Sequence, residues 1–205
     1  IPPHVVKIGD DVFYGCEEIE SIQFSEDSEI QFIGKNFLSY SPVKKVSIPS
    51  RILSNLSFSL FGEISRLNEV SILSNDGSCI LYENKILLCK SDKKSDIYDV
   101  LLFGYRNIEE VKVPFYVKKI AQNAFCNCFH LKKIEFDERS KLIEICDNAF
   151  TNTQIVSISI PSSVRRIGDY AFQFCESLVS VEIPENSELT FVGKGAFENS
   201  AIERL

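Results

Sequence analysis

The sequence predicts a mostly β solenoid: a right-handed arc of stacked repeats, with a parallel sheet on one face and short turns and helical turns on the other. Three observations indicate this fold: a phenylalanine that recurs at near-constant spacing, an alternating apolar segment after it, and a proline that often closes that segment. Repeats of 22 to 25 residues are too short to bury their own apolar side chains. Stacking the repeats side by side would bury these side chains in one continuous core.

The recurring phenylalanine sets the length of the repeat. Its seven positions are separated by 24, 24, 64, 25, 22 and 25 residues, so only the third interval departs from the period. That interval holds one further repeat and an insertion. The seven positions are Phe13, Phe37, Phe61, Phe125, Phe150, Phe172 and Phe197.

The residues that follow each phenylalanine come in a fixed order. An apolar residue stands at +5 or +6, and a pair of apolar residues two apart comes next, as at Val181 and Ile183. This alternation is typical of a strand, and a proline after it, such as Pro184, cannot donate a ladder hydrogen bond. The +3 position is held by Cys16, Tyr40, Ile64, Cys128, Thr153, Cys175 and Ser200. We therefore expect a strand in each repeat, then a glycine turn, then helix-like spacing around the phenylalanine.

The third interval contains an interruption over residues 74–106. Its apolar segments are separated by the turn-like Glu83-Asn84 and by the charged stretch 91–96. We predict two or three antiparallel strands there, near Cys79–Tyr82, Lys85–Cys89 and Tyr98–Phe103. The interruption either bridges two arrays of repeats or protrudes as a contact element, with residues 91–96 as its exposed tip.

The domain organisation follows from the repeats and their interruption. We predict three repeats over residues 1–73, an irregular repeat with a β-hairpin or meander insertion over 74–113, and four repeats over 114–205, the last one truncated. The chain begins with IPP, ends with AIERL and contains no methionine. An open solenoid end exposes its apolar cross-section, so we expect the native protein to continue beyond both ends.

The repeats resemble a known family. The segments IPSSVRRIGDYAFQFCESLVSVEIP and LVSVEIPENSELTFVGKGAFENS are similar to the BspA-like class of leucine-rich repeats, whose consensus is roughly L-x-x-I-x-I-P-x-x-V-x-x-I-G-x-x-A-F-x-x-C. The resemblance covers nearly the whole chain and is weakest over residues 49–65. It implies a horseshoe or arc. It also implies a typical role, because members are often cell-surface or secreted proteins of bacteria and of parasitic or commensal protists, and several are implicated in adhesion to host proteins or cells.

Composition and motifs exclude several classes of function. The net charge of −7 disfavours nucleic-acid binding, and no apolar run approaches the roughly 20 residues of a membrane-spanning helix. His4 and His130, the only histidines, lie far apart along the array, and no CxxC or phosphate-loop motif occurs. We therefore expect no catalytic, metal or cofactor site. The chain contains a single N-x-S/T sequon, at Asn55. One such match is expected by chance in a chain of this length, so it does not indicate secretion.

The cysteines at +3 are expected to be packing residues. Ile64 and Thr153 replace Cys16, Cys128 and Cys175 at the same place in other repeats. A nucleophile would not be interchangeable with isoleucine, whereas a buried free cysteine behaves as a small apolar residue. The remaining thiols are placed by their neighbours: Cys146 in the interior or near a turn, and Cys126 at a position that could be exposed.

The residues between the inward strand positions are the candidate interaction surface. We expect Glu109 and Glu110 to lie beside Lys132 and Lys133 on the neighbouring strand. These charges either pair only with one another or contact a protein partner, and the face becomes neutral towards its C-terminal end. No row of Trp or Tyr crosses this face, so it does not indicate a sugar-binding platform. The candidate residues are Lys44, Lys45, Glu69, Glu109, Glu110, Lys132, Lys133, Val156, Val179, Ser180 and Glu182.

The function predicted from these observations is that of a non-enzymatic protein–protein interaction module. The resemblance implies a cell-surface or secreted ectodomain fragment that binds a host or extracellular matrix protein. The alternative is an intracellular scaffold, which seven cysteines without a recognisable disulfide framework favour. A remote alternative is an enzyme of unknown class. The sequence leaves the oligomeric state open.

Overall fold

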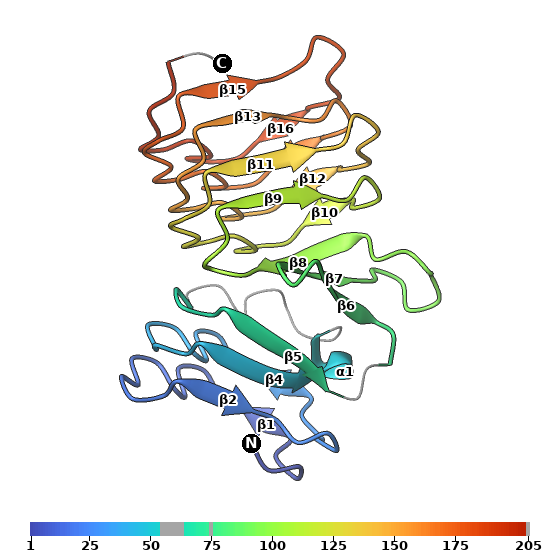
Figure 1. Ribbon diagram of the computed structural model, residues 1–205, viewed down its shortest axis with the longest axis vertical. Coiled ribbons are helices and arrows are strands. Elements are labelled where there is room, and N and C mark those ends of the chain that lie inside the picture. The colour runs from blue at the N-terminus through green and yellow to red at the C-terminus, as the bar shows by residue number, and fades with distance from the viewer. Residues whose placement is uncertain (54–63, 74–75, 204–205) are drawn as a thin grey trace.

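The computed structural model of the chain is a solenoid of stacked turns with almost no helix (Figure 1). The structure describes residues 1–53, 64–73 and 76–203. We call the position of the recurring phenylalanine in each repeat the ladder position. Phe61, which is predicted to occupy it, and the sequon at Asn55 lie outside the described residues. The single α-helix among them is one turn long, α1 (Ser50–Leu53).

The alternating segments form one row of strands, which we call the front sheet. Its hydrogen-bonded groups are β2-β4-β5, β9-β11 and β13-β15, and every pair in them is parallel. Equivalent residues of successive repeats lie opposite one another, as Val111 does to Ile134. The strands are β2 (Ser21–Gln23), β4 (Lys45–Pro49), β5 (Glu69–Leu73), β9 (Glu110–Val113), β11 (Lys133–Phe136), β13 (Ser157–Ser159) and β15 (Ser180–Glu182).

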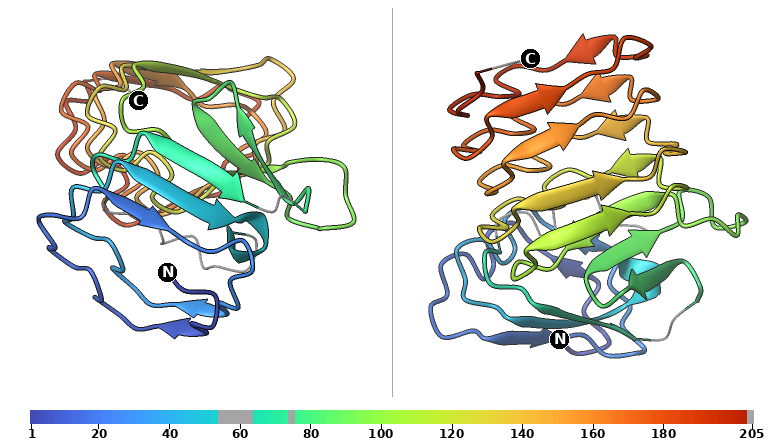
Figure 2. Two further views of the ribbon diagram at one scale, coloured as in Figure 1. Left: turned by 60° about the horizontal axis from the view of Figure 1, so that its bottom comes forward. Right: turned by 45° about the horizontal axis from the view of Figure 1, so that its top comes forward.

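A second row of strands, the back sheet, faces the first across the core. Both rows are visible in the right-hand view of Figure 2. Apart from one strand that comes from the insertion and was predicted, the back strands arise from the apolar pair upstream of the phenylalanine, such as Val164 and Ile167, which sequence analysis had not assigned to a strand. They are β1 (Lys7–Ile8), β3 (Phe32–Ile33), β8 (Val100–Gly104), β10 (Lys119–Ile120), β12 (Glu144–Ile145), β14 (Arg166–Ile167) and β16 (Phe191–Val192). Each regular repeat therefore contributes one strand to each sheet.

A glycine follows β14 because the preceding repeat approaches closely there. A Cβ atom on Gly168 would lie 2.4 Å from Oδ1 of Asp147 in the preceding repeat. That same oxygen accepts a hydrogen bond from the Asp169 N–H at 2.9 Å, and Asp169 Oδ1 accepts one from the Lys194 N–H at 2.9 Å. The glycine and aspartate thus join one repeat to the next, and their role is structural.

The third side of the solenoid consists of tight turns around the phenylalanine. Around Phe150, both Asn148 and Asn152 have positive φ angles, 55° and 61°. An α-helix cannot contain residues in this left-handed conformation, so the helix-like spacing expected here forms consecutive turns instead. The Asn148 carbonyl accepts the Thr151 N–H, and the Phe150 N–H donates to the Ala171 carbonyl of the next repeat at 2.7 Å.

The prediction that Phe37 occupies the ladder position of the second repeat is wrong. The Phe13 N–H donates to the Phe37 carbonyl, whereas the Phe150 N–H donates to an alanine of the next repeat. Phe37 therefore occupies the alanine position, and Leu38, which is buried, takes the ladder position. The +3 residue of this repeat is Ser41, and the predicted Tyr40 lies on the surface with 68% of its area exposed. Two apolar residues in sequence made the register ambiguous.

The ladder phenylalanines stack in the repeats that follow the insertion, which we call the C-terminal array; the repeats before it are the N-terminal array. Phe125, Phe150, Phe172 and Phe197 form three successive contacts with ring centroids 5.2, 5.0 and 5.3 Å apart and interplanar angles of 7°. In the N-terminal array, Leu38 occupies the ladder position in place of a phenylalanine and interrupts this order. The Phe13 and Phe37 rings there are tilted by 59°. The stack is therefore regular only where the A-F pattern is regular.

The insertion forms the predicted antiparallel strands and also extends the back sheet. Strand β6 (Cys79–Tyr82) pairs with β7 (Ile86–Cys89), and β7 pairs with β8, which lies parallel to β10. All residues of β7 and β8 are buried. The exposed loop over residues 91–96 confirms the predicted tip. The strands of the insertion thus end the C-terminal array and do not project from it.

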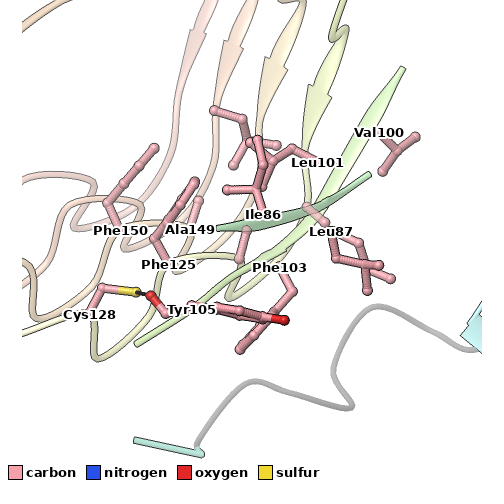
Figure 3. Close-up of a cluster of buried hydrophobic side chains, with 14 of the residues drawn as sticks. Ile86, Leu87, Val100, Leu101, Phe103, Tyr105, Phe125, Cys128, Ala149 and Phe150 are labelled. Carbon is pink, nitrogen blue, oxygen red and sulfur yellow. Dashed lines mark hydrogen bonds between the residues drawn. The ribbon is translucent and has the colours of Figure 1, made fainter. Parts of the chain in front are cut away.

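Two residues at the end of the insertion connect the two arrays. The Tyr105 hydroxyl accepts the Val70 N–H at 3.1 Å, and Arg106 donates from Nε to the Ile64 carbonyl at 3.0 Å and from Nη1 to the Ala124 carbonyl at 3.0 Å. Figure 3 shows Tyr105 next to the buried cluster of the C-terminal array. The insertion therefore bridges the two arrays, as one of the two predicted alternatives requires.

Replacing Phe172 by alanine should lower the free energy of unfolding by about 3–5 kcal/mol, because it removes one of the two inner rings of the stack and leaves a cavity. Equilibrium urea denaturation measures this change. The matched control is Phe191→Ala, whose ring is 45% exposed; its effect should stay below about 1 kcal/mol. Equal losses from the two variants would contradict the role given to the stack.

Candidate interaction surface

Two of the three thiols at the +3 position, Cys128 and Cys175, are buried packing residues, as predicted, whereas Cys16 is only half-buried. Cys128 and Cys175 have no exposed area, and neither has Thr153, which replaces them in the intervening repeat. Burial raises the pKa of the Cys175 thiol, although its hydrogen bond with Thr153 acts in the opposite direction. Burial also raises the pKa of Cys128, against the effect of the nearby Arg106 guanidinium. Neither thiol is available as a nucleophile.

The other thiols divide into buried and accessible groups. Burial, together with the Glu144 carboxylate, raises the pKa of Cys146 to about 12. Cys126 is 7% exposed, so the surface position considered for it is wrong. Its side chain is buried among the consecutive turns. Cys16, in the N-terminal array, is half-buried and is the most accessible of the five free cysteines.

The insertion contains a disulfide that sequence analysis did not find. Cys79 and Cys89 lie directly opposite each other on β6 and β7, with their Cα atoms 4.1 Å apart. A three-residue loop, 83–85, sets this register, since Tyr82 lies opposite Ile86. The spacing of the two cysteines in sequence reveals the pair only when the length of that loop is known.

The charged part of the predicted front-sheet surface is paired internally. Lys44 lies 2.5 Å from Glu20, and Lys45 lies 2.8 Å from Glu69 on the neighbouring strand. The hydrogen bond and charge of Glu69 raise the pKa of Lys45. These side chains are exposed, so each pair contributes little to stability.

The central rows of the front sheet follow the same pattern. Lys132 lies 3.5 Å from Glu109, as predicted. Lys133 lies opposite Glu110 in register but forms its ion pair with Glu135 of its own strand, which raises the pKa of Lys133. The lysines of this surface therefore each have a carboxylate partner within the molecule.

Towards its C-terminal end the front sheet carries a neutral segment. Val156 and Val179 lie on adjacent repeats, are 50% and 40% exposed, and are joined by a hydrogen bond from the Val179 N–H to the Val156 carbonyl at 3.0 Å. Ser157 lies opposite Ser180 in the next strand. We call Val156, Ser157, Val179 and Ser180 the neutral patch. The remaining predicted residue, Glu182, lies beside the patch and accepts a hydrogen bond from Ser159 at 2.5 Å.

The outer face of the back sheet carries a charged row that sequence analysis missed. Glu144 lies 2.9 Å from Lys119 Nζ and 3.2 Å from Arg166 Nε, and Arg166 also lies 3.0 Å from Asp147. Apart from β8, the back strands are only two residues long, so no alternation marks their outward positions. Like the lysines of the front sheet, these charges are paired across repeats.

No constellation for metal-dependent chemistry occurs in the described part of the chain. Within it, no group of three or more His, Cys, Asp or Glu side chains could hold a metal ion. His4 and His130 are both exposed and belong to different arrays. The described residues include no helix that is long and apolar enough to cross a membrane.

The repeat pattern and its two-sheet geometry agree with one family of repeat proteins. The sequence model of the family described as the BspA type leucine-rich repeat region matches the chain in six copies, over residues 1–85 and 96–205. The chain belongs to the BspA-type leucine-rich repeat family. No curated protein matches this BspA-type chain.

Two solved structures share the fold of the BspA-type chain. A leucine-rich repeat protein from Eubacterium ventriosum has a TM-score of 0.64 at 15% identity, over 98% of this chain and 82% of that one. The pneumococcal vaccine antigen PcpA has a TM-score of 0.68 at 18% identity, over 98% of this chain and 56% of that one. The first is similar over most of its length and the second over about half. At these identities the likeness shows the fold alone.

In the native protein, a thiol reagent should modify Cys16 faster than any other free cysteine, because burial shields the other four. Mass spectrometry over time measures the number of modified thiols. Cys175→Ser should leave the fast phase unchanged, whereas Cys16→Ser should remove it. Loss of the fast phase in Cys175→Ser would show that Cys175 is a reactive thiol.

Proposed function

We propose that this chain is a non-enzymatic interaction module that binds a protein partner with the front sheet, centred on the neutral patch. The observation that carries the proposal is the pair of exposed valines, Val156 and Val179, on adjacent repeats. Charged residues are depleted at the cores of protein interfaces, and desolvating an ion pair costs free energy. The paired lysines would therefore form the rim of the interface and the valines its centre.

The proposed module has two arrays. Residues 1–73 form the N-terminal array, residues 74–113 the connecting segment, and residues 114–205 the C-terminal array that carries the neutral patch. The regular phenylalanine stack beneath this patch supports the assignment, because a rigid sheet loses little conformational freedom when a partner binds.

We place the protein at a cell surface or outside the cell, where it binds a host or extracellular matrix protein. The disulfide between Cys79 and Cys89 supports this location, because disulfides persist in oxidising compartments. The family points the same way, and one structural neighbour is described as a vaccine antigen. An intracellular scaffold is the second candidate, which the five free cysteines favour.

Changing Val156 and Val179 to glutamate, singly and together, should weaken binding to immobilised extracellular matrix proteins by about tenfold per substitution, because each places a charge in the interface core. Surface plasmon resonance against a panel of matrix proteins measures the affinities. The matched control is Val192→Glu, at a valine 49% exposed on β16. An equal loss in the control, or no binding by the unmodified protein, would contradict the proposed surface or the partner class.

An antibody against the chain should label intact cells, and the protein isolated from them should contain the Cys79–Cys89 cross-link in peptides prepared without reducing agent. Cells permeabilised before labelling serve as the control for total protein. Labelling only after permeabilisation, together with free thiols at both positions, would exclude the surface location and favour the scaffold.

A further inference from the structure

The turn side of the solenoid contains a cleft that the proposed function does not use. Its volume is about 910 Å³, which lies within the range of small-ligand sites. One wall comes from the turn over residues 35–40, and the other from the turns over 122–129, 148–152 and 173–174. The front sheet and its neutral patch contribute no residue to the described lining of this cleft.

Side-chain amides from successive repeats line the cleft. Asn152 Nδ2 donates to Asn127 Oδ1 at 2.9 Å, and Asn123, Asn148 and Gln173 line the same space. Each amide carries two donors and an acceptor. This contact uses neither the Asn127 amino group nor the Asn152 side-chain carbonyl oxygen, so in the described structure both remain available to a ligand.

Exposed aromatic rings line the cleft at positions that do not suit them. Phe174 and Tyr40 stand two residues after the ladder position, have φ angles of 57°, and are 41% and 68% exposed. The equivalent residues Asn127 and Asn152 have φ angles of 62° and 61°. Asparagine tolerates this left-handed conformation, whereas a bulky side chain there is strained, and such strain is concentrated at functional sites. The Tyr40 ring packs against Tyr14, with ring centroids 5.3 Å apart. Phe174 forms no such ring contact among the described residues and is not buried in the core, so packing does not explain the choice of phenylalanine there.

The lining is almost uncharged. Lys35 is the only Lys, Arg, Asp or Glu among the described residues around the cleft, and Phe129, 48% exposed, adds a third aromatic ring. Planar amides can both donate to and accept from neighbouring hydroxyl groups. Aromatic faces pack against the C–H face of a sugar ring, and burying this apolar area is favourable. Amides and aromatic rings without charge therefore favour a neutral polyhydroxylated ligand over a peptide or an anion.

We propose that this cleft is a second binding site and that it binds a neutral oligosaccharide. Phe174, Tyr40 and Phe129 provide stacking surfaces for the sugar rings. Asn127 and Asn152 hydrogen-bond to the sugar hydroxyl groups. The lining residues Asn152 and Phe174 precede Val156 and Val179 closely in sequence, but no residue of the neutral patch lines the cleft. Substitutions in the cleft can therefore be tested separately from substitutions in the patch.

The test is isothermal titration calorimetry with a panel of neutral hexasaccharides of glucose, mannose, galactose and xylose. At least one should bind with a Kd of about 1 mM or tighter. Phe174→Asn should weaken this binding by about tenfold or more and should also raise the Tm, because asparagine fits the left-handed conformation without strain. This opposite change in stability and affinity separates a ligand-binding ring from a structural one.

Two controls complete the design. Phe191→Asn removes a ring of similar exposure outside the cleft, 45% against 41%, and should leave affinity unchanged. Asn152→Ala keeps the aromatic rings and should weaken binding by removing amide hydrogen bonds. Absence of binding by the unmodified protein up to about 10 mM, full affinity in Phe174→Asn, or equal losses in Phe191→Asn would each overturn the proposal. A lower Tm for Phe174→Asn would overturn the argument from strain on which it rests.

Discussion

The left-handed turn around each ladder residue is the constraint on which the rest of the solenoid depends. Two residues of positive φ flank the ladder position, as Asn123 and Asn127 flank Phe125 with angles of 59° and 62°. They reverse the chain in so few residues that the strands before and after it belong to different sheets. Because the turn has the same form in successive repeats, equivalent residues meet, and the rings of Phe125 and Phe150 stack at 7°. The asparagines of this face are thus explained first by backbone conformation.

The same constraint explains why the interruption needs special residues. The insertion lies between β5 and β9 and replaces the regular turn of one repeat; β5 and β9 belong to separate hydrogen-bonded groups of the front sheet. Tyr105 and Arg106 connect the repeats here in place of the regular turn. The Tyr105 hydroxyl bonds to the Val70 backbone, and the Arg106 guanidinium donates to carbonyl groups of both arrays. The Arg106 side chain is 3% exposed and lies 4.4 Å from the Phe103 ring centroid. A buried guanidinium is costly unless its donors are satisfied, so this residue is specific to the junction.

The sequence predicted what depends on periodicity and missed what depends on register. The front strands and the strands of the insertion follow from alternation, and the buried thiols follow from interchangeability at +3. Phe37 was misplaced because two adjacent apolar residues fit the pattern equally well and only the hydrogen bond from Phe13 decides between them. The disulfide between Cys79 and Cys89 depends on a loop one residue longer than a two-residue hairpin. Two-residue strands have no period to detect, so the back sheet and its charged row remained hidden.

On each face of a repeat protein, equivalent positions of successive repeats form a row. A position whose residue type differs from that of its equivalents is a candidate for function. On the front sheet the departure is a loss of charge: Val156 and Val179 stand where Lys132 stands in the preceding repeat. On the turn side it is a gain of aromatic area: Phe174 stands where Asn127 and Asn152 stand in their repeats. The first change places two exposed valines directly before β13 and β15 and leaves the inward positions of these strands unchanged. The second imposes a strained backbone, and a fold that could use asparagine at this position retains phenylalanine only if the ring has a use outside the core.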